Sequence, residues 1–174
     1  MDPTLLNENE NENFISYCTD GYLQKVKEIC HTKTIHSSII VEGFTNASMS
    51  NNLLICKWLT ENYNITCDYL GSSLVACFGW AAIYGNEDLF KWLFYRFGFP
   101  DKKYYLNEEK RQDLFLTLVR DKNHNIIKFM FEVGDFCKND IIEIKGIQEE
   151  EKEKLLKFYD ETFPLGSFTK KVKM

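Results

Sequence analysis

The sequence predicts an all-α fold, specifically a helix-turn-helix repeat solenoid of about four to five units. Three observations indicate it: a short turn recurs four times along the chain, a phenylalanine stands seven residues before each turn begins, and a lysine stands six residues after that point. A helical hairpin of this size cannot bury its apolar face alone, so copies must stack to form a continuous core. Self-similarity with a period of roughly 20 to 50 residues is the usual signature of such an architecture.

The four turns define the elements in order along the chain. They are Gly21-Tyr22-Leu23, Asn51-Asn52-Leu53, Gly85-Asn86-Glu87 and Lys122-Asn123-His124. The phenylalanines before them are Phe14, Phe44, Phe78 and Phe115. The lysines after them are Lys27, Lys57, Lys91 and Lys128, at intervals of 30, 34 and 37 residues. We therefore expect each unit to have a short helix beginning near the phenylalanine, a tight turn and a second helix carrying the lysine, with the phenylalanines in a shared core.

The residues around each lysine support a helix with one apolar face. Apolar residues come directly before it, at Val26, Cys56, Phe90 and Ile127, and again two residues after it, at Ile29, Leu59, Leu93 and Met130. The residue directly after the lysine is Trp58, Trp92 or Phe129 in three units, but Glu28 in the first. A more polar first unit suits the end of a stack, where one face meets water.

Four segments follow from these patterns. Residues 1–13, where Asn and Glu alternate, are expected to be a flexible lead-in, and residues 14–136 the repeat stack. Residues 137–166 are expected to be a capping helix region, because Gln148–Phe158 places acidic residues before basic ones as the helix dipole favours. That helix is either a cap or a partial fifth unit. Residues 167–174 form a basic tail.

Composition narrows the classes of function. The 174 residues carry a formal net charge of −5, which gives no general attraction for nucleic acid and makes a basic partner easier to attract. No apolar run approaches the roughly 20 residues that cross a bilayer, and no secretory signal is visible. We expect no membrane association and a cytoplasmic location, host cytoplasm if the chain is viral, or the nucleus. The six cysteines have no CxxC pair and are expected to be reduced and mostly buried.

Candidate chemistry is sparse. The chain has only three histidines, His31, His36 and His124, and none is at a recognised spacing from another catalytic candidate. Cys30, His31 and His36 lack a fourth zinc ligand. No glycine-rich phosphate-binding loop is present. We therefore expect no enzymatic activity, no metal and no cofactor, with a small hydrolase using Cys18 or Cys77 as the enzymatic alternative.

The third unit resembles a known family. Ala81 to Leu93 reads AAIYGNEDLFKWL, in which two small residues precede a glycine turn and a second helix, and this resembles the ankyrin repeat. In that family the small residues let the two helices approach, and glycine accepts a positive φ. The small pair recurs at Ala47-Ser48. Use of Asn, Lys and Ile is similar to that of degenerate ankyrin-repeat proteins of large DNA viruses or of protists with AT-rich genomes.

The resemblance covers Phe14 to Phe136 and departs from the family pattern in three ways. No unit has a Thr-Pro-Leu-His opening, and the turn glycine occurs only at Gly21 and Gly85. The small pair is replaced by Tyr17-Cys18 and by Leu118-Val119 in two units.

The resemblance implies a function in binding proteins. Ankyrin repeats bind partners through exposed positions of the first helices and through loops. The aligned positions are Ser16, Thr19 and Asp20, then Asn46, Met49 and Ser50, then Trp80, Ile83 and Tyr84, and finally Thr117, Arg120 and Asp121. Large aromatic side chains often anchor interfaces. We expect a non-enzymatic adaptor or inhibitor that captures a host or cellular protein, with Trp80, Ile83 and Tyr84 central and Met49 and Arg120 flanking.

Two alternatives stay open. The long segment Phe97–Asp113 could fold back over the aromatic residues and make them part of a core. The chain could also be a structural or assembly subunit, virion-associated or scaffolding, that self-associates. The sequence does not identify the partner.

Overall fold

The computed structural model describes residues 5–98, 108–133, 137–144 and 146–164. Every regular element in these ranges is an α-helix, which confirms the predicted all-α class; the β-type contact they contain is an isolated bridge between Leu5 and Thr34. The chain divides into two compact units, Met1–Lys110 and Arg111–Met174. The division falls inside the predicted stack 14–136, and each unit is described by itself.

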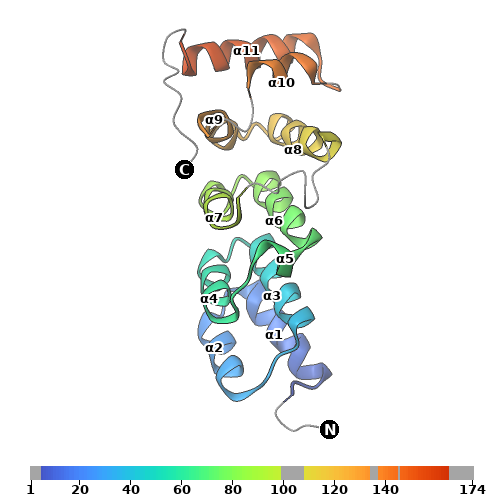
Figure 1. Ribbon diagram of the computed structural model, residues 1–174, viewed down its shortest axis with the longest axis vertical. Helices are drawn as coiled ribbons and strands as arrows, with labels where there is room; N and C mark the ends of the chain where they lie inside the picture. Colours follow the sequence, from blue (N-terminus) through green and yellow to red (C-terminus); the bar gives the residue numbers. More distant parts are fainter. Residues whose placement is uncertain (1–4, 99–107, 134–136, 145, 165–174) are drawn as a thin grey trace. The chain divides into compact units, whose positions relative to one another are not determined.

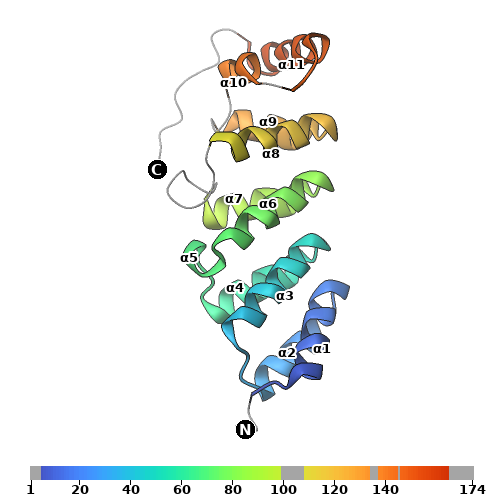
Figure 2. The same ribbon diagram turned by 90° about the vertical axis from the view of Figure 1, so that its right-hand side faces the viewer.

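The first unit is built from three helical hairpins. Its helices are α1 (Glu8–Asp20), α2 (Leu23–Thr32), α3 (Ser37–Met49), α4 (Leu53–Tyr63), the short α5 (Cys67–Leu70), α6 (Ser72–Ile83) and α7 (Glu87–Phe97). α1 packs against α2, α3 against α4 and α6 against α7. α3 also packs between α1 and α6, so these first helices form one layer, while α2, α4 and α7 form the other (Figures 1 and 2).

The turns that join the two helices of each hairpin share one geometry. Their first residues all have a left-handed φ: 82° at Gly21, 59° at Asn51, 65° at Gly85 and 55° at Lys122. The next residue has φ near −80° and ψ between 61° and 74° in each case, at Tyr22, Asn52, Asn86 and Asn123. The third residue donates its N–H to the carbonyl oxygen of the first at 2.8–3.0 Å, which closes an inverse γ-turn. The predicted equivalence of the four turns is confirmed.

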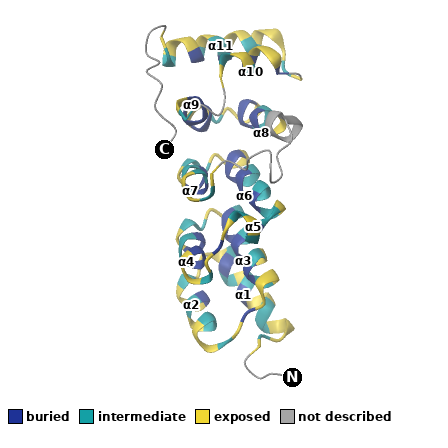
Figure 3. Cartoon of the chain, in the orientation of Figure 1, coloured by how far each residue is buried: buried dark blue, intermediate teal, exposed yellow. Residues whose placement is uncertain are grey.

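The four aligned phenylalanines are buried, as predicted. Phe14, Phe44 and Phe78 are 0% exposed and Phe115, in the second unit, is 1% exposed. Phe78 packs edge-on against Phe90 of α7, with ring centroids 5.2 Å apart, so the two helices of the third hairpin meet through their rings. The expected start of the first helices was wrong, because each begins six or seven residues before its phenylalanine. Figure 3 colours the buried parts of the helices dark blue.

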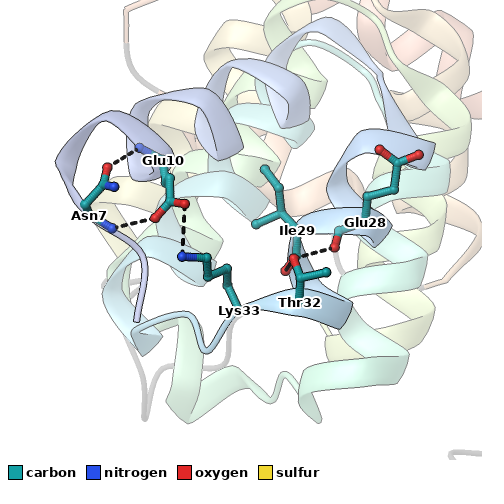
Figure 4. A network of polar contacts seen from close by, with 6 residues as sticks. All are labelled: Asn7, Glu10, Glu28, Ile29, Thr32 and Lys33. Atoms are coloured by element: carbon teal, nitrogen blue, oxygen red, sulfur yellow. Dashed lines mark hydrogen bonds and ion pairs between the residues drawn. The ribbon is translucent and has the colours of Figure 1, made fainter. Parts of the chain in front are cut away.

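The N-terminal region is helical over residues that were expected to be flexible. Residues 8–13 were predicted to be flexible, but they form the first half of α1. Asn7 caps the helix: its Oδ1 accepts the Glu10 N–H at 3.0 Å, and its own N–H donates to Glu10 Oε2 at 2.9 Å (Figure 4). Glu10 also forms an ion pair with Lys33 at 3.1 Å. This capping box stabilises a helix start that the polar composition concealed.

The second unit contains most of α8 (Glu108–Arg120), with α9 (His124–Glu132), α10 (Lys138–Glu143) and α11 (Glu149–Thr162). Phe131 of α9 is central, with ring centroids 6.0 Å from Phe115 and 4.9 Å from Tyr159. α10 packs against α11, and Lys138 pairs with Asp160 at 2.7 Å. α11 confirms the predicted helix over Gln148–Phe158. The predicted basic tail, 167–174, lies outside the described residues.

A helix that crosses a bilayer needs roughly 20 predominantly apolar residues in succession. None of the described helices combines the length and the apolar character that a membrane-crossing helix requires.

Candidate functional site

One exposed surface of the first unit is made by equivalent positions of α1, α3 and α6. These positions lie 13, 9, 5, 2 and 1 residues before the first turn residue, a spacing that places them on one side of a helix. They are Glu8, Glu12, Ser16, Thr19 and Asp20 of α1, Ser38, Glu42, Asn46, Met49 and the C-cap Ser50 of α3, and Ser72, Ala76, Trp80, Ile83 and the C-cap Tyr84 of α6. None of them is buried. We call this surface the first-helix face.

The aromatic part of the first-helix face lies on α6. The rings of Trp80 and Tyr84 are stacked, with centroids 5.6 Å apart and planes inclined by 15°. Tyr84 is 59% exposed and Ile83 42% exposed, while Trp80 and Met49 are partly exposed. The structure therefore brings Trp80, Ile83 and Tyr84 together at the end of one helix, where an incoming side chain can reach them.

Two further expectations concern the surroundings of these aromatic residues: the flanking Arg120 and the segment Phe97–Asp113. Arg120 is exposed at the C-terminal end of α8 and belongs to the second unit, so its grouping with Trp80 stays a prediction. The alternative in which Phe97–Asp113 folds over the aromatic residues falls largely on residues 99–107, outside the described part. Phe97 itself packs against Phe44 and Trp92, with ring centroids 6.0 and 5.8 Å away.

Three of the cysteines, Cys18, Cys56 and Cys77, lie where thiolate formation is unfavourable. All six cysteines are free; Cys18, Cys56 and Cys77 are buried, Cys30 and Cys67 are half-buried and Cys137 is exposed, so the expected burial is found for three of the six. Burial raises the pKa of Cys77 to about 11 and that of Cys18 well above its ordinary range. A catalytic cysteine needs a lowered pKa and access to substrate. The buried environments of Cys18 and Cys77 have neither property.

Two of the histidines, His36 and His124, make contacts close to the helix ends where they stand. His36 is the N-cap of α3, where its Nδ1 accepts the Ser38 N–H at 3.3 Å. The ring of His124 lies 5.6 Å from that of Phe158. Within the described ranges, no group of three or more His, Cys, Asp and Glu residues is arranged to hold a metal ion.

The second unit has a hollow of about 420 Å³ between the α8–α9 turn and α11. Its lining includes Ile127 and Phe158, together with Lys122, Glu151 and Lys154. Lys154 is already paired with Glu150 at 2.7 Å. Because positive and negative groups share this rim, its charge favours neither an anionic nor a cationic ligand.

Sequence reasoning missed the carboxylates of the first-helix face. Glu8, Glu12 and Glu42 are exposed on the same side of α1 and α3 as the predicted positions. The signal was present in the spacing: one helical turn before Ser16 and Asn46 stand Glu12 and Glu42, and two turns before Ser16 stands Glu8. The alignment stopped earlier because the first helices were expected to begin near the phenylalanines.

Comparison with known proteins does not indicate a function for this chain. No family model, no curated protein and no solved structure matches this chain. The exposed side chains of the chain are therefore the basis for assigning its function.

Proposed function

We propose that this chain is a non-enzymatic protein-interaction module of ankyrin-like repeats, an adaptor or inhibitor whose first-helix face captures a host or cellular protein. The observation that carries the proposal is the Trp80–Tyr84 stack beside Ile83, in which Tyr84 and Ile83 are exposed and Trp80 is partly exposed. The common turn geometry and the buried phenylalanines support the ankyrin-like part, since both are expected of stacked helical hairpins.

The aromatic stack suits an interface anchor for energetic reasons. Aromatic side chains bury a large apolar area, and they lose little conformational entropy when they become fixed because few bonds rotate. The contact with Trp80 already restrains Tyr84. A partner covering this patch would remove Ile83 and Tyr84 from water at a small ordering cost.

The test compares a variant of the patch with a matched control. Tyr84→Ala is expected to weaken partner binding by about 30-fold, the effect of a hot-spot residue of roughly 2 kcal/mol. Tyr95→Ala is the control, because Tyr95 is 73% exposed on α7 in the other layer. A partner purified with the tagged chain would be titrated by calorimetry, and the unfolding temperature of each variant would be measured. Equal affinity losses for both variants, or a loss explained by unfolding, would contradict the proposal.

A structural or assembly role is the second candidate. It is favoured by exposed apolar side chains in the other layer, where Leu54 of α4 is 69% exposed and Tyr95 of α7 is 73% exposed. A permanent interface would cover such residues. Light scattering of the purified chain separates the two roles: a monomer favours capture of a different protein, and a concentration-dependent oligomer that Leu54→Ser dissociates favours assembly.

A further inference from the structure

The two helix layers of the first unit differ in the sign of the charges that they carry. Every residue of α1, α3, α5 and α6 is described, and these helices contain no lysine, arginine or histidine. Their charged residues are all acidic: Glu8, Glu10, Glu12, Asp20, Glu42 and Asp68. The opposite layer, α2, α4 and α7, carries charges of both signs. Its basic residues are Lys25, Lys27, His31, Lys57, Lys91 and Arg96, and its acidic residues are Glu28, Glu61, Glu87 and Asp88.

The carboxylates of the first-helix face are not neutralised by the described part of the chain. Glu10, outside this face, is paired with Lys33. Glu8, Glu12 and Glu42 are exposed and make no ion pair within the described ranges. Asp20 accepts a hydrogen bond from the Ser16 hydroxyl at 3.1 Å but has no cationic partner there. The face therefore presents several exposed negative charges beside an aromatic stack.

These two features favour the same kind of ligand group. The face of an aromatic ring attracts a cation, and arginine suits such a site because its planar, weakly hydrated guanidinium can stack on the ring while donating hydrogen bonds to carboxylates. Glu42 lies on α3, which packs against α6, and is one helical turn before the row that contains Asn46 and Trp80. A cation on Trp80 and Tyr84 would thus have one carboxylate, that of Glu42, in the adjacent helix.

We propose that the first-helix face binds a positively charged protein segment, with an arginine on the Trp80–Tyr84 stack and further basic side chains along Glu12 and Glu42. This inference rests on the proposed function and deepens it by giving the chemistry of the partner. Phosphate backbones and acidic segments are disfavoured because these carboxylates repel them. Uncompensated charge on one face also accelerates encounter with a basic partner in a salt-dependent way.

The experiment selects peptides from a random display library on the full chain and measures the enriched peptides by fluorescence anisotropy. Enriched peptides are expected to be net positive and to contain arginine. Replacing that arginine with citrulline, its neutral isostere, is expected to weaken binding by about tenfold. The double variant Glu12→Gln and Glu42→Gln is expected to weaken it by about threefold and to flatten its salt dependence.

Glu61→Gln is the matched control, because Glu61 is an exposed carboxylate on α4 in the other layer, and it is expected to leave binding unchanged. Neutral peptides that still require Trp80 and Tyr84 would overturn the charge inference and leave the interaction function standing. If no enriched peptide is sensitive to Trp80→Ala or Tyr84→Ala, both proposals fail. Arginine peptides that bind equally well to the double variant would place the basic segment elsewhere and overturn this assignment.

Discussion

The side-chain amide of Asn52 donates hydrogen bonds to two backbone carbonyl oxygens at the end of α1, that of Cys18 at 3.0 Å and that of Thr19 at 2.7 Å. Carbonyls in the last turn of a helix have no donor within the helix and need one from elsewhere. Asn52 is the middle residue of the second turn, so the second hairpin caps the first helix of the preceding hairpin. A Cβ at Gly21 would lie 2.8 Å from Asn52 Oδ1, so glycine there gives the amide room.

Asn52→Ala should destabilise the first unit by about 1 to 3 kcal/mol, because two partly buried carbonyls lose their donor. Urea unfolding followed by tryptophan fluorescence measures this, since Trp58, Trp80 and Trp92 all belong to the first unit. Asn62→Ala is the control, because the Asn62 amide donates to the Trp58 carbonyl on an exposed surface and water can replace it. Equal destabilisation by the two substitutions would argue against the inter-hairpin cap.

Lys122→Gly should stabilise the second unit by about 0.5 to 1 kcal/mol. Lys122 has a φ of 55°, a conformation that costs a residue with a Cβ about 1 to 2 kcal/mol, and the greater freedom of glycine in the unfolded chain offsets part of this gain. Asn51→Gly should gain less, because asparagine tolerates this conformation.

The measurement for Lys122→Gly is amide hydrogen exchange of α9, the helix that follows the turn. Lys128→Gly is the control, since Lys128 lies inside α9 and glycine there should cost about 1 kcal/mol. A destabilising Lys122→Gly would contradict the left-handed turn.

The turns and the positions of the buried phenylalanines could be predicted because they repeat in sequence. The exposure of Tyr84 and the partial exposure of Trp80 followed from the same alignment. The helix before Phe14 was missed because its Asn-Glu composition is polar and only the capping pair Asn7 and Glu10 marks its start. The link from Asn52 to α1 joins residues more than 30 apart, and no local pattern encodes it.

Gly43→Ala should destabilise the first unit by about 1 to 3 kcal/mol through overpacking. A Cβ at Gly43 of α3 would lie 2.6 Å from Phe14 Cε1 and 3.1 Å from Cys18 Sγ, and both side chains are fully buried in α1. Gly79→Ala in α6 is the matched control, because a Cβ there meets nothing within 4 Å, and it should stabilise by about 0.5 to 1 kcal/mol. Tryptophan-monitored urea unfolding should therefore show changes in the free energy of unfolding of opposite sign for the two variants. Destabilisation by Gly79→Ala would contradict the open space beside Gly79 of α6.

The buried thiols predict a loss of stability in alkali. Burial raises the pKa of Cys56 from 9.0 to about 12 and that of Cys77 to about 11. Above pH 9 the unfolded chain releases thiol protons that the folded chain keeps, so the free energy of unfolding falls as pH rises, by up to about 1.4 kcal/mol per pH unit for each thiol. Below pH 9 both states keep these protons and the contribution is fully present.

Urea unfolding under reducing conditions between pH 8 and pH 10.5 tests whether the buried thiols cause this fall in the free energy of unfolding. Cys77→Ala should be less stable than the parent chain at pH 8, because it leaves a small cavity. Its free energy of unfolding should nevertheless fall less steeply above pH 9, because one buried thiol no longer titrates in the unfolded chain. If Cys77→Ala and the parent chain have the same slope, the alkaline loss comes from groups other than this thiol.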